Sequence, residues 1–139
     1  KLIARDNGRT PFHWDASANA GFSNATPWLK VNPNYFEINA AAQEVVENSP
    51  LNYFRRLIRF RKLNEALIYG GAEYFDMENP SVFAYSRTLG DARFLMLINF
   101  KAENATFDVP CDLSKTTQVF GNYDSFDGSL KPYQATILE

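Results

Sequence analysis

The chain has 139 residues, of which 45% are hydrophobic, and 14 basic against 16 acidic side chains give a formal net charge of −2. This composition is typical of a globular protein and argues against a nucleic-acid-binding protein, which would more often carry a basic patch. No segment approaches the roughly 20 apolar residues of a membrane span. We therefore expect no nucleic-acid or membrane partner, and a cytoplasmic protein.

Thiol and metal chemistry are limited by the same composition. The sequence holds one cysteine, Cys111, and one histidine, His13, so neither an intrachain disulfide nor a zinc-type ligand cluster is expected. Cys111 follows Val109-Pro110 and has no histidine near it in the sequence, which favours a half-buried thiol over a reactive one. We expect no metal site and no cofactor.

The opening segment is polar, aromatic and rich in turn-forming residues, and it shows no helical or strand period. Residues 1–35 hold both tryptophans and the histidine. Long loops without regular structure are uncommon in compact domains and are often functional. The chain also begins at Lys1 rather than at a methionine. We expect a piece cut from a larger enzyme, in which these loops contribute to a site.

One amphipathic helix is predicted over residues 50–63, after a weaker helical patch at 40–46. Ser49 is suited to cap the helix and Pro50 to its first position. Apolar side chains then recur at helical spacing at Leu51, Phe54 and Leu57. The basic residues that follow are expected to form a solvated face. The apolar stripe needs a partner, which the rest of the chain can supply only in part.

After Tyr69-Gly70-Gly71 the hydrophobic period changes from 3.6 to 2, which indicates strands. Residues 89–91 form a turn between two of them. Short strands at this spacing suggest a small antiparallel sandwich or barrel. The chain therefore divides into residues 1–70, with loops and one helix, and residues 71–139, a β domain. The expected strands cover residues 73–77, 81–88, 93–100, 105–109, 118–122 and 132–138.

Four segments of the loop region, residues 5–15, 19–22, 26–28 and 31–39, read as motifs similar to RDN-x-RTPMQWD, NAGF, TPW and VNPNY-x-EIN. Further motifs lie at residues 53–58, 61–62, 81–85, 98–100 and 130–135. Together these segments resemble the C-terminal part of glycoside hydrolase family 13, the α-amylase family, in its oligo-1,6-glucosidase, α-glucosidase and sucrose-isomerase branch. The resemblance spans the whole chain, and its first block is specific.

The resemblance implies a mainly β fold: a small antiparallel β-sandwich, preceded by loops and one helix from the end of a (β/α)8 barrel. Residues 1–70 would be the remnant of that barrel. The implied function is the C-terminal portion of a retaining α-glucosidase acting on short α-glucosides with α-1,6 or related linkages. Retaining glycosidases need two carboxyl groups ~5–5.5 Å apart. In the family these lie upstream, so no catalytic residue is assigned, and the chain alone is expected to be inactive.

One substrate-binding residue is implied by the resemblance, namely Arg5. Its counterpart closes the pocket for the terminal glucose and pairs with an aspartate of the barrel, a task that suits the planar guanidinium. The alternative is a salt bridge within the loop, with Asp6 or Asp15. Neither aspartate matches a catalytic motif, and we expect both to make structural hydrogen bonds. Arg9 is expected to organise the loop.

The sequence departs from the family pattern at Phe12 and His13, where Met-Gln is usual. Because Phe also occurs there in sucrose-isomerase-like members, a sucrose isomerase or trehalulose-type transglucosidase is the alternative reading. His13 is expected to bond locally rather than to face the acceptor sugar. Three loop aromatics either stack on sugars or pack loops against the barrel. They are Trp14, Trp28 and Tyr35.

A second alternative is a non-catalytic carbohydrate-binding β domain. It would use exposed aromatic side chains, for which packing inside the domain is the simpler explanation. The expected partners are an oligosaccharide substrate and the missing catalytic barrel. Self-association of the chain through its uncovered apolar stripe is also expected. The aromatic candidates are Tyr74, Phe75, Tyr123 and Phe126.

Overall fold

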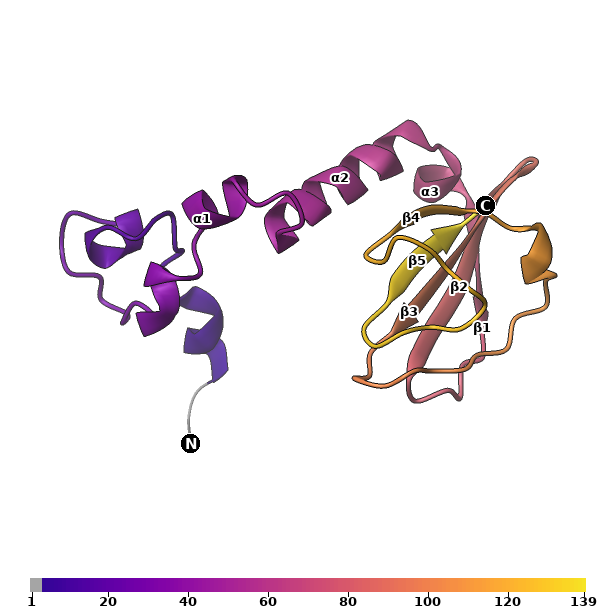
Figure 1. Ribbon diagram of the computed structural model, residues 1–139. Helices are drawn as coiled ribbons and strands as arrows, with labels where there is room; N and C mark the ends of the chain where they lie inside the picture. Colours follow the sequence, from indigo (N-terminus) through magenta and orange to yellow (C-terminus); the bar gives the residue numbers. More distant parts are fainter. Residues whose placement is uncertain (1–3) are drawn as a thin grey trace. The chain divides into compact units, whose positions relative to one another are not determined.

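A computed structural model describes the backbone of residues 4–139 and the side chains of residues 6–139. The chain forms two units, of which the first ends at Arg56 and the second is Leu57–Glu139 (Figure 1). The boundary falls inside helix α2, Pro50–Leu63. The expected division at residue 70, into a barrel remnant and a β domain, stays a prediction.

The first unit is built from irregular segments, as predicted. It contains three 3-10 helices, Ala4–Arg9, Ala18–Gly21 and Pro33–Phe36, and one short helix, α1, Ala40–Glu44. Helix α1 begins after Asn39, whose side-chain oxygen accepts a hydrogen bond from the Ala42 N–H at 2.8 Å. The weak helical patch in the sequence is therefore a short capped helix.

Helix α2 has the predicted bounds. Ser49 caps it by accepting a hydrogen bond from the Asn52 N–H at 3.2 Å, and Pro50 is its first residue. None of its residues is fully buried, and Phe54 is 60% exposed. Its last turns lie against the core of the second unit through Leu57 and Phe60. The predicted partial covering of the apolar stripe is confirmed. Among residues 4–139, no helix has the length and apolarity that crossing a membrane would need.

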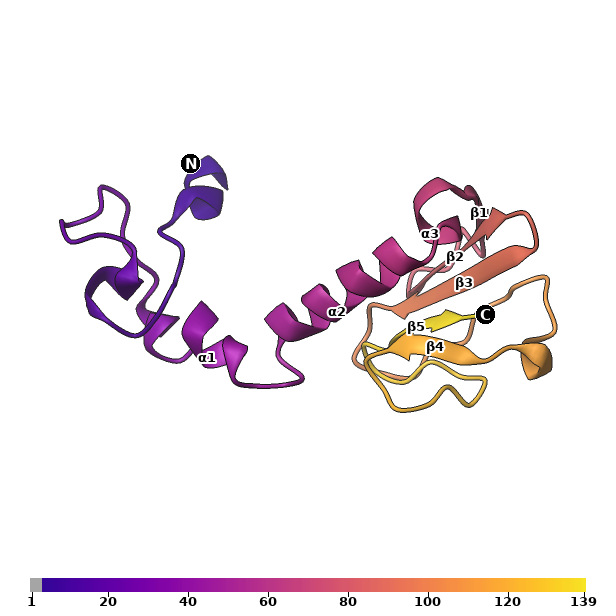
Figure 2. The ribbon, with the colours of Figure 1, turned by 90° about the horizontal axis from the view of Figure 1, so that it is seen from above.

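The second unit is a five-stranded antiparallel sheet with one short helix, α3, Ala66–Tyr69. The strand order is β1-β2-β3-β5-β4 (Figure 2). The predicted antiparallel, mainly β fold is confirmed, and the sequence indicated neither helix α3 nor the 3-10 helix Leu113–Lys115. The strands are β1 Gly71–Phe75, β2 Val82–Leu89, β3 Ala92–Asn99, β4 Gln118–Gly121 and β5 Ala135–Leu138.

Strand β3 lies in the middle of this sheet, and both of its faces are covered. Leu95 and Leu97 belong to a cluster with Val82 and Leu130 on one face. Phe94 and Met96 belong to a second cluster, which includes Ile137, on the other face. Covering on both faces explains the nearly continuous apolar run of this strand.

The expectation of a strand over residues 105–109 is wrong. In this region the described residues form only one isolated bridge, Ala105 with Leu130. The backbone groups beyond it bond to side chains: Asn79 donates to the Thr106 carbonyl at 3.0 Å, and the Asp108 N–H donates to Asp76 at 3.1 Å. The described strands therefore form one sheet, and loop residues such as Phe107, Val109 and Phe126 pack against the core on one of its faces.

Gly70 and Gly71 provide a matched test of the close packing where helix α3 meets strand β2. A Cβ atom on Gly70 would lie 2.4 Å from the Ala66 carbonyl oxygen and 2.8 Å from that of Thr88, whereas one on Gly71 would meet no atom within 4 Å. Both neighbours of Gly70 are backbone atoms, which cannot move aside. We expect Gly70→Ala to lower the free energy of unfolding by about 3 kcal/mol and Gly71→Ala to change it little, as measured by urea denaturation. Equal effects of the two substitutions would contradict this packing.

Candidate functional site

The candidate site is the loop block of the first unit, and Arg9 joins two of its loops. The Arg9 guanidinium forms an ion pair with Asp6. It also lies 5.1 Å from the centre of the Trp28 ring, a cation–π contact. The prediction that Arg9 organises the loops is confirmed, and Asp6 is engaged in that structural role.

Asp15 fixes a tight turn in the same block. It accepts hydrogen bonds from the backbone N–H and the hydroxyl of Ser17. Its carboxylate also lies against Gly21, where a Cβ atom would come within 2.8 Å. The hydrogen bond from the Ser17 hydroxyl has the larger effect and that from the Ser17 N–H the smaller, and together they hold the pKa of Asp15 below its usual value. The expected structural hydrogen bonding of Asp15 is confirmed.

The turn itself uses backbone conformations that few residues adopt readily. Asn19, Ala20 and Gly21 all have positive φ, at 55°, 58° and 65°. The Asn19 side chain donates to the carbonyls of Ser23 and Ala25, at 2.9 and 3.2 Å. Side-chain bonds of this kind stabilise left-handed backbone. The segment identified only as a family motif in the sequence is therefore a rigid turn.

His13 connects the loop block to helix α1. Its Nδ1 lies 2.9 Å from the Ile38 carbonyl oxygen, so Nδ1 carries the proton and donates it. The carbonyls of His13 and Trp14 accept the N–H groups of Ala40 and Ala41, each at 2.9 Å. Together with the Asn39 cap, these bonds satisfy the first N–H groups of α1. The expectation of a locally bonded histidine is confirmed.

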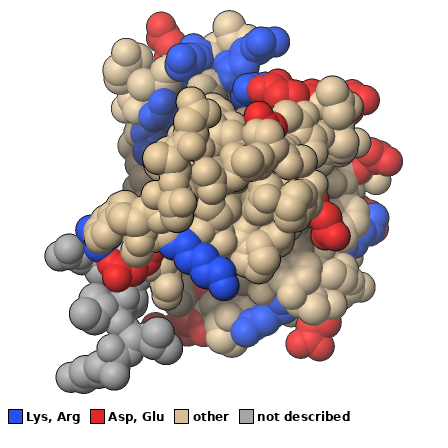
Figure 3. Space-filling model, turned by 90° about the vertical axis from the view of Figure 1, so that its left-hand side faces the viewer, with Lys and Arg blue, Asp and Glu red and all other residues tan. Residues whose placement is uncertain are grey.

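A cleft of about 500 Å³ lies between these loops and the start of α2. Phe12, Ile38, Leu51 and Phe54 give it apolar walls, and His13 lies at its margin. Figure 3 faces this unit and shows mainly uncharged side chains over the middle of the view. The cleft presents an apolar surface with few polar groups, and it contains no pair of carboxylates.

The loop aromatics remain accessible. Trp28 is 81% exposed, and Trp14 makes an edge contact with Phe12 at 4.7 Å between ring centres. The Tyr35 ring lies 4.0 Å from that of Phe36. Sugar stacking and loop packing both remain predictions for these rings.

Most aromatic candidates of the β domain pack inside it. Phe75 is buried in the core, and Phe126 packs against the same core. The Tyr123 hydroxyl donates to the Pro132 carbonyl at 2.8 Å. Only Tyr74 is largely exposed, beside Phe83 and Tyr85. The expectation that packing inside the domain explains these aromatics is confirmed for Phe75 and Phe126. Cys111 is half-buried against the core, as predicted.

The side chain of Arg5 lies outside the described residues, and its backbone belongs to the first 3-10 helix. Its sugar-binding role stays a prediction. Among the described residues, no group of three His, Cys, Asp or Glu side chains is arranged to hold a metal ion. Sequence reasoning did not identify Asn39, which is 4% exposed and holds both α1 and the Tyr35 carbonyl. An Asn before a run of alanines is the signal that would have found it.

The Asp15 turn makes a pH-dependent prediction. Because the folded pKa of Asp15 lies below the unfolded one, its contribution to loop order is present above the unfolded pKa and is lost as pH falls through the folded value. Ser17→Ala removes the hydroxyl donor and should raise the pKa of Asp15, as followed by the carboxyl ¹³C shift. Ser23→Ala, in the same loop but bonded to Ala25, should leave it unchanged. An unchanged titration in Ser17→Ala would contradict the assignment.

Comparison with known proteins agrees with the motifs. The family described as alpha amylase, catalytic domain, matches residues 1–70. An oligo-1,6-glucosidase of Bacillus cereus is 40% identical over 145 residues, which cover 99% of this chain and 26% of that protein. An alpha-glucosidase of Schizosaccharomyces pombe is 38% identical over 144 residues, covering 98% of this chain and 25% of that protein.

Solved structures show the same relationship. The chain matches a mutant isomaltulose synthase of Erwinia rhapontici NX5, solved with its natural substrate sucrose, with a TM-score of 0.85 and 45% identity. The match covers 96% of this chain and 25% of that one. The chain thus spans about a quarter of the length of the relatives it matches. Because the catalytic-domain family matches half of its residues, the chain belongs to the alpha-amylase family.

Proposed function

We propose that the chain is the C-terminal part of a retaining α-glucosidase that hydrolyses short α-glucosides with α-1,6 or related linkages. The loop motifs of residues 5–39 and relatives named oligo-1,6-glucosidase support this proposal. In it, the loop block forms part of the substrate pocket. Helix α2 is the last barrel helix, and the sheet is the domain that follows the barrel.

The catalytic carboxylates belong to the remainder of the parent enzyme. A retaining mechanism needs a nucleophile and an acid/base about 5–5.5 Å apart. In the loop block, Asp6 pairs with Arg9 and Asp15 is held by Ser17. Both carboxylates are committed to loop structure, which supports a binding rather than a catalytic role for this chain.

Arg5 closes the pocket for the terminal glucose in this proposal. Its alternative was a salt bridge with Asp6 or Asp15, and both aspartates already have partners in the structure. That favours a carboxylate from outside the loop block. A guanidinium presents fixed, planar donors that serve a carboxylate and sugar hydroxyls together.

Isomerisation of sucrose is the second candidate. The isomaltulose synthase of Erwinia rhapontici is 45% identical to this chain, against 40% for the Bacillus cereus glucosidase. Phe12 also stands where most glucosidases of the branch have Met. The two candidates share the glucose pocket and differ in whether water or fructose takes the glucosyl group.

The isolated chain should have no glucosidase activity, because the proposal places the paired catalytic carboxylates in the remainder of the parent enzyme. Incubation of the pure 139-residue chain with a chromogenic α-glucoside measures this directly. Steady release of the chromophore by the pure chain would refute the assignment of the chemistry to the missing part.

A chimera tests whether the chain can serve as the C-terminal part of an active glucosidase. The chain replaces the C-terminal quarter of the Bacillus cereus oligo-1,6-glucosidase, and we expect hydrolysis of isomaltose. Arg5→Ala in the chimera should lower kcat/KM by roughly 100-fold, as expected for a lost charged hydrogen-bond donor to substrate. Arg93→Ala, which removes the same charge from an exposed site in β3, should have little effect.

The products formed from sucrose distinguish the two candidates. Glucose and fructose indicate hydrolysis, whereas isomaltulose or trehalulose indicates isomerisation. A folded chimera inactive on isomaltose and on sucrose would contradict both candidates. Equal activity of Arg5→Ala and Arg93→Ala would remove Arg5 from the pocket.

A further inference from the structure

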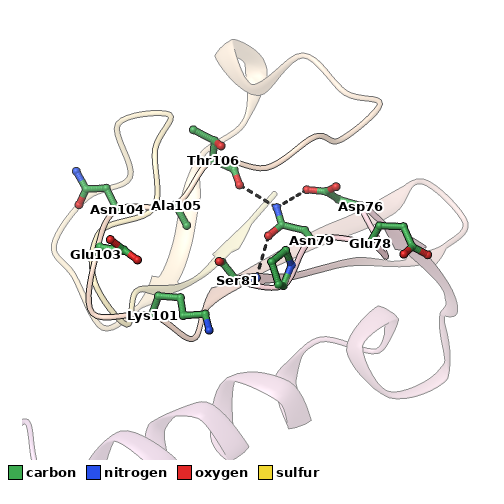
Figure 4. Close-up of a pocket in the computed structure, with 10 residues that line it drawn as sticks. Asp76, Glu78, Asn79, Ser81, Lys101, Glu103, Asn104, Ala105 and Thr106 are labelled. Atoms are coloured by element: carbon green, nitrogen blue, oxygen red, sulfur yellow. Dashed lines mark hydrogen bonds between the residues drawn. The ribbon is translucent and has the colours of Figure 1, made fainter.

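A cavity of about 430 Å³ lies in the second unit, between the loop that joins β1 to β2 and the loop that follows β3. Figure 4 shows Asp76 and Glu78 on one side and Lys101 and Glu103 on the other, with Asn79 between them. Its size is within the ~300–1,000 Å³ of small-molecule sites. The cavity is separate from the loop block of the first unit.

Two asparagines fix the walls of this cavity. Asn79 donates to Asp76 and to the Thr106 carbonyl, and accepts from the N–H groups of Ser81 and Val82 (Figure 4). Asn99, 2% exposed, holds the opposite loop by donating to the Glu103 carbonyl and accepting from the Lys101 N–H. The hydrogen-bonding capacity of the Asn79 amide is filled. The walls are therefore formed before any ligand arrives.

Three charged side chains at the rim have unused bonding capacity. Within residues 6–139, no hydrogen bond or ion pair is made by the carboxylates of Glu78 and Glu103 or by the ammonium group of Lys101. Together they offer acceptors from both sides and one strong donor. Such a mixture suits a ligand that both donates and accepts hydrogen bonds.

The charge of the cavity limits the class of ligand. Three carboxylates, including that of Asp76, and one lysine line the cavity, and their net negative charge disfavours an anion. The Asp76 Oδ2 atom already accepts from Asn79 and from the Asp108 N–H. No described group of three acidic, Cys or His residues is arranged to hold a metal ion. Hydroxyl groups donate to carboxylates and accept from an ammonium group, so a ligand with several hydroxyl groups fits this lining.

An apolar pocket of about 280 Å³ adjoins the cavity and shares Asp76, Asn79 and Pro80 with it. Phe83 and Phe100 line this pocket, and Phe100 is 61% exposed. The Phe100 N–H donates to the Ser81 carbonyl at 2.9 Å, which connects the aromatic wall to the polar one. A polar edge beside aromatic rings matches a sugar, which has hydroxyls at its rim and C–H groups on its faces.

We propose that this cavity and the adjoining pocket form a binding site for a neutral oligosaccharide. Lys101, Glu78 and Glu103 bond its hydroxyl groups, and Phe100 covers a sugar face. The site lies in the second unit and needs no catalytic group. It therefore goes beyond the proposed glucosidase function and does not depend on it.

The test is an NMR titration of the ¹⁵N-labelled 139-residue chain with isomaltotriose, with maltotriose and with glucose 6-phosphate. We expect millimolar binding of at least one trisaccharide, with shift changes at residues 76–81 and 100–106. Phe100→Ala and Glu103→Gln should each weaken it by about tenfold. The matched controls are Tyr69→Ala, an exposed aromatic in α3, and Asp91→Asn in the β2–β3 turn. Both should bind as the unaltered chain does.

Each other outcome refutes the site. The site is refuted if neither trisaccharide, at tens of millimolar, changes the shifts of residues 76–81 and 100–106. It is also refuted if the phosphorylated sugar binds equally well. Trisaccharide binding that is unchanged in Phe100→Ala and Glu103→Gln would refute it as well. Shift changes confined to residues 10–40 would support the loop block as a sugar site and reject this one. The spectrum of each variant reports its folding, so a misfolded variant is recognised directly.

Discussion

Irregular backbone in this chain is held by asparagine and aspartate side chains, and the two units depend on this hydrogen bonding. Backbone N–H and C=O groups that no helix or strand pairs still need partners. Asn19 and Asn39 supply them in the loop block, and Asn79 and Asn99 supply them at one end of the sheet. Asp15 does the same for its own turn.

These hydrogen bonds also bear on what the carboxylates of the loop block can do. A carboxylate that accepts loop N–H groups is kept ionised and in place, as the lowered pKa of Asp15 illustrates. Such bonds commit the carboxylate to the structure of its own loop. The loop block combines carboxylates held in this way with exposed aromatic rings, which is consistent with the proposed assignment of acid and base groups to another part of the parent enzyme.

The two units differ in how completely they bury apolar surface. The sheet covers both faces of β3, whereas Phe54 of α2 and Trp28 of the loops remain exposed. The loop unit has few buried side chains, and its order comes mainly from hydrogen bonds and from contacts such as that of Arg9 with Trp28. Exposed apolar area on that scale is typical of a surface that packs against another body.

The sequence by itself determined the elements with strong local signals. Helix α2 follows from Ser49, Pro50 and the apolar spacing, and β3 follows from its continuous apolar run, because periodicity and capping act over a few residues. The family was also readable from motifs such as Arg9-Thr10-Pro11. Only the tertiary structure decided that residues 105–109 contribute a single bridge, Ala105 with Leu130, and that Asn99 donates to the Lys131 carbonyl. Those outcomes depend on partners far away in the chain, as Lys131 is from Asn99, and no local pattern encodes such pairs.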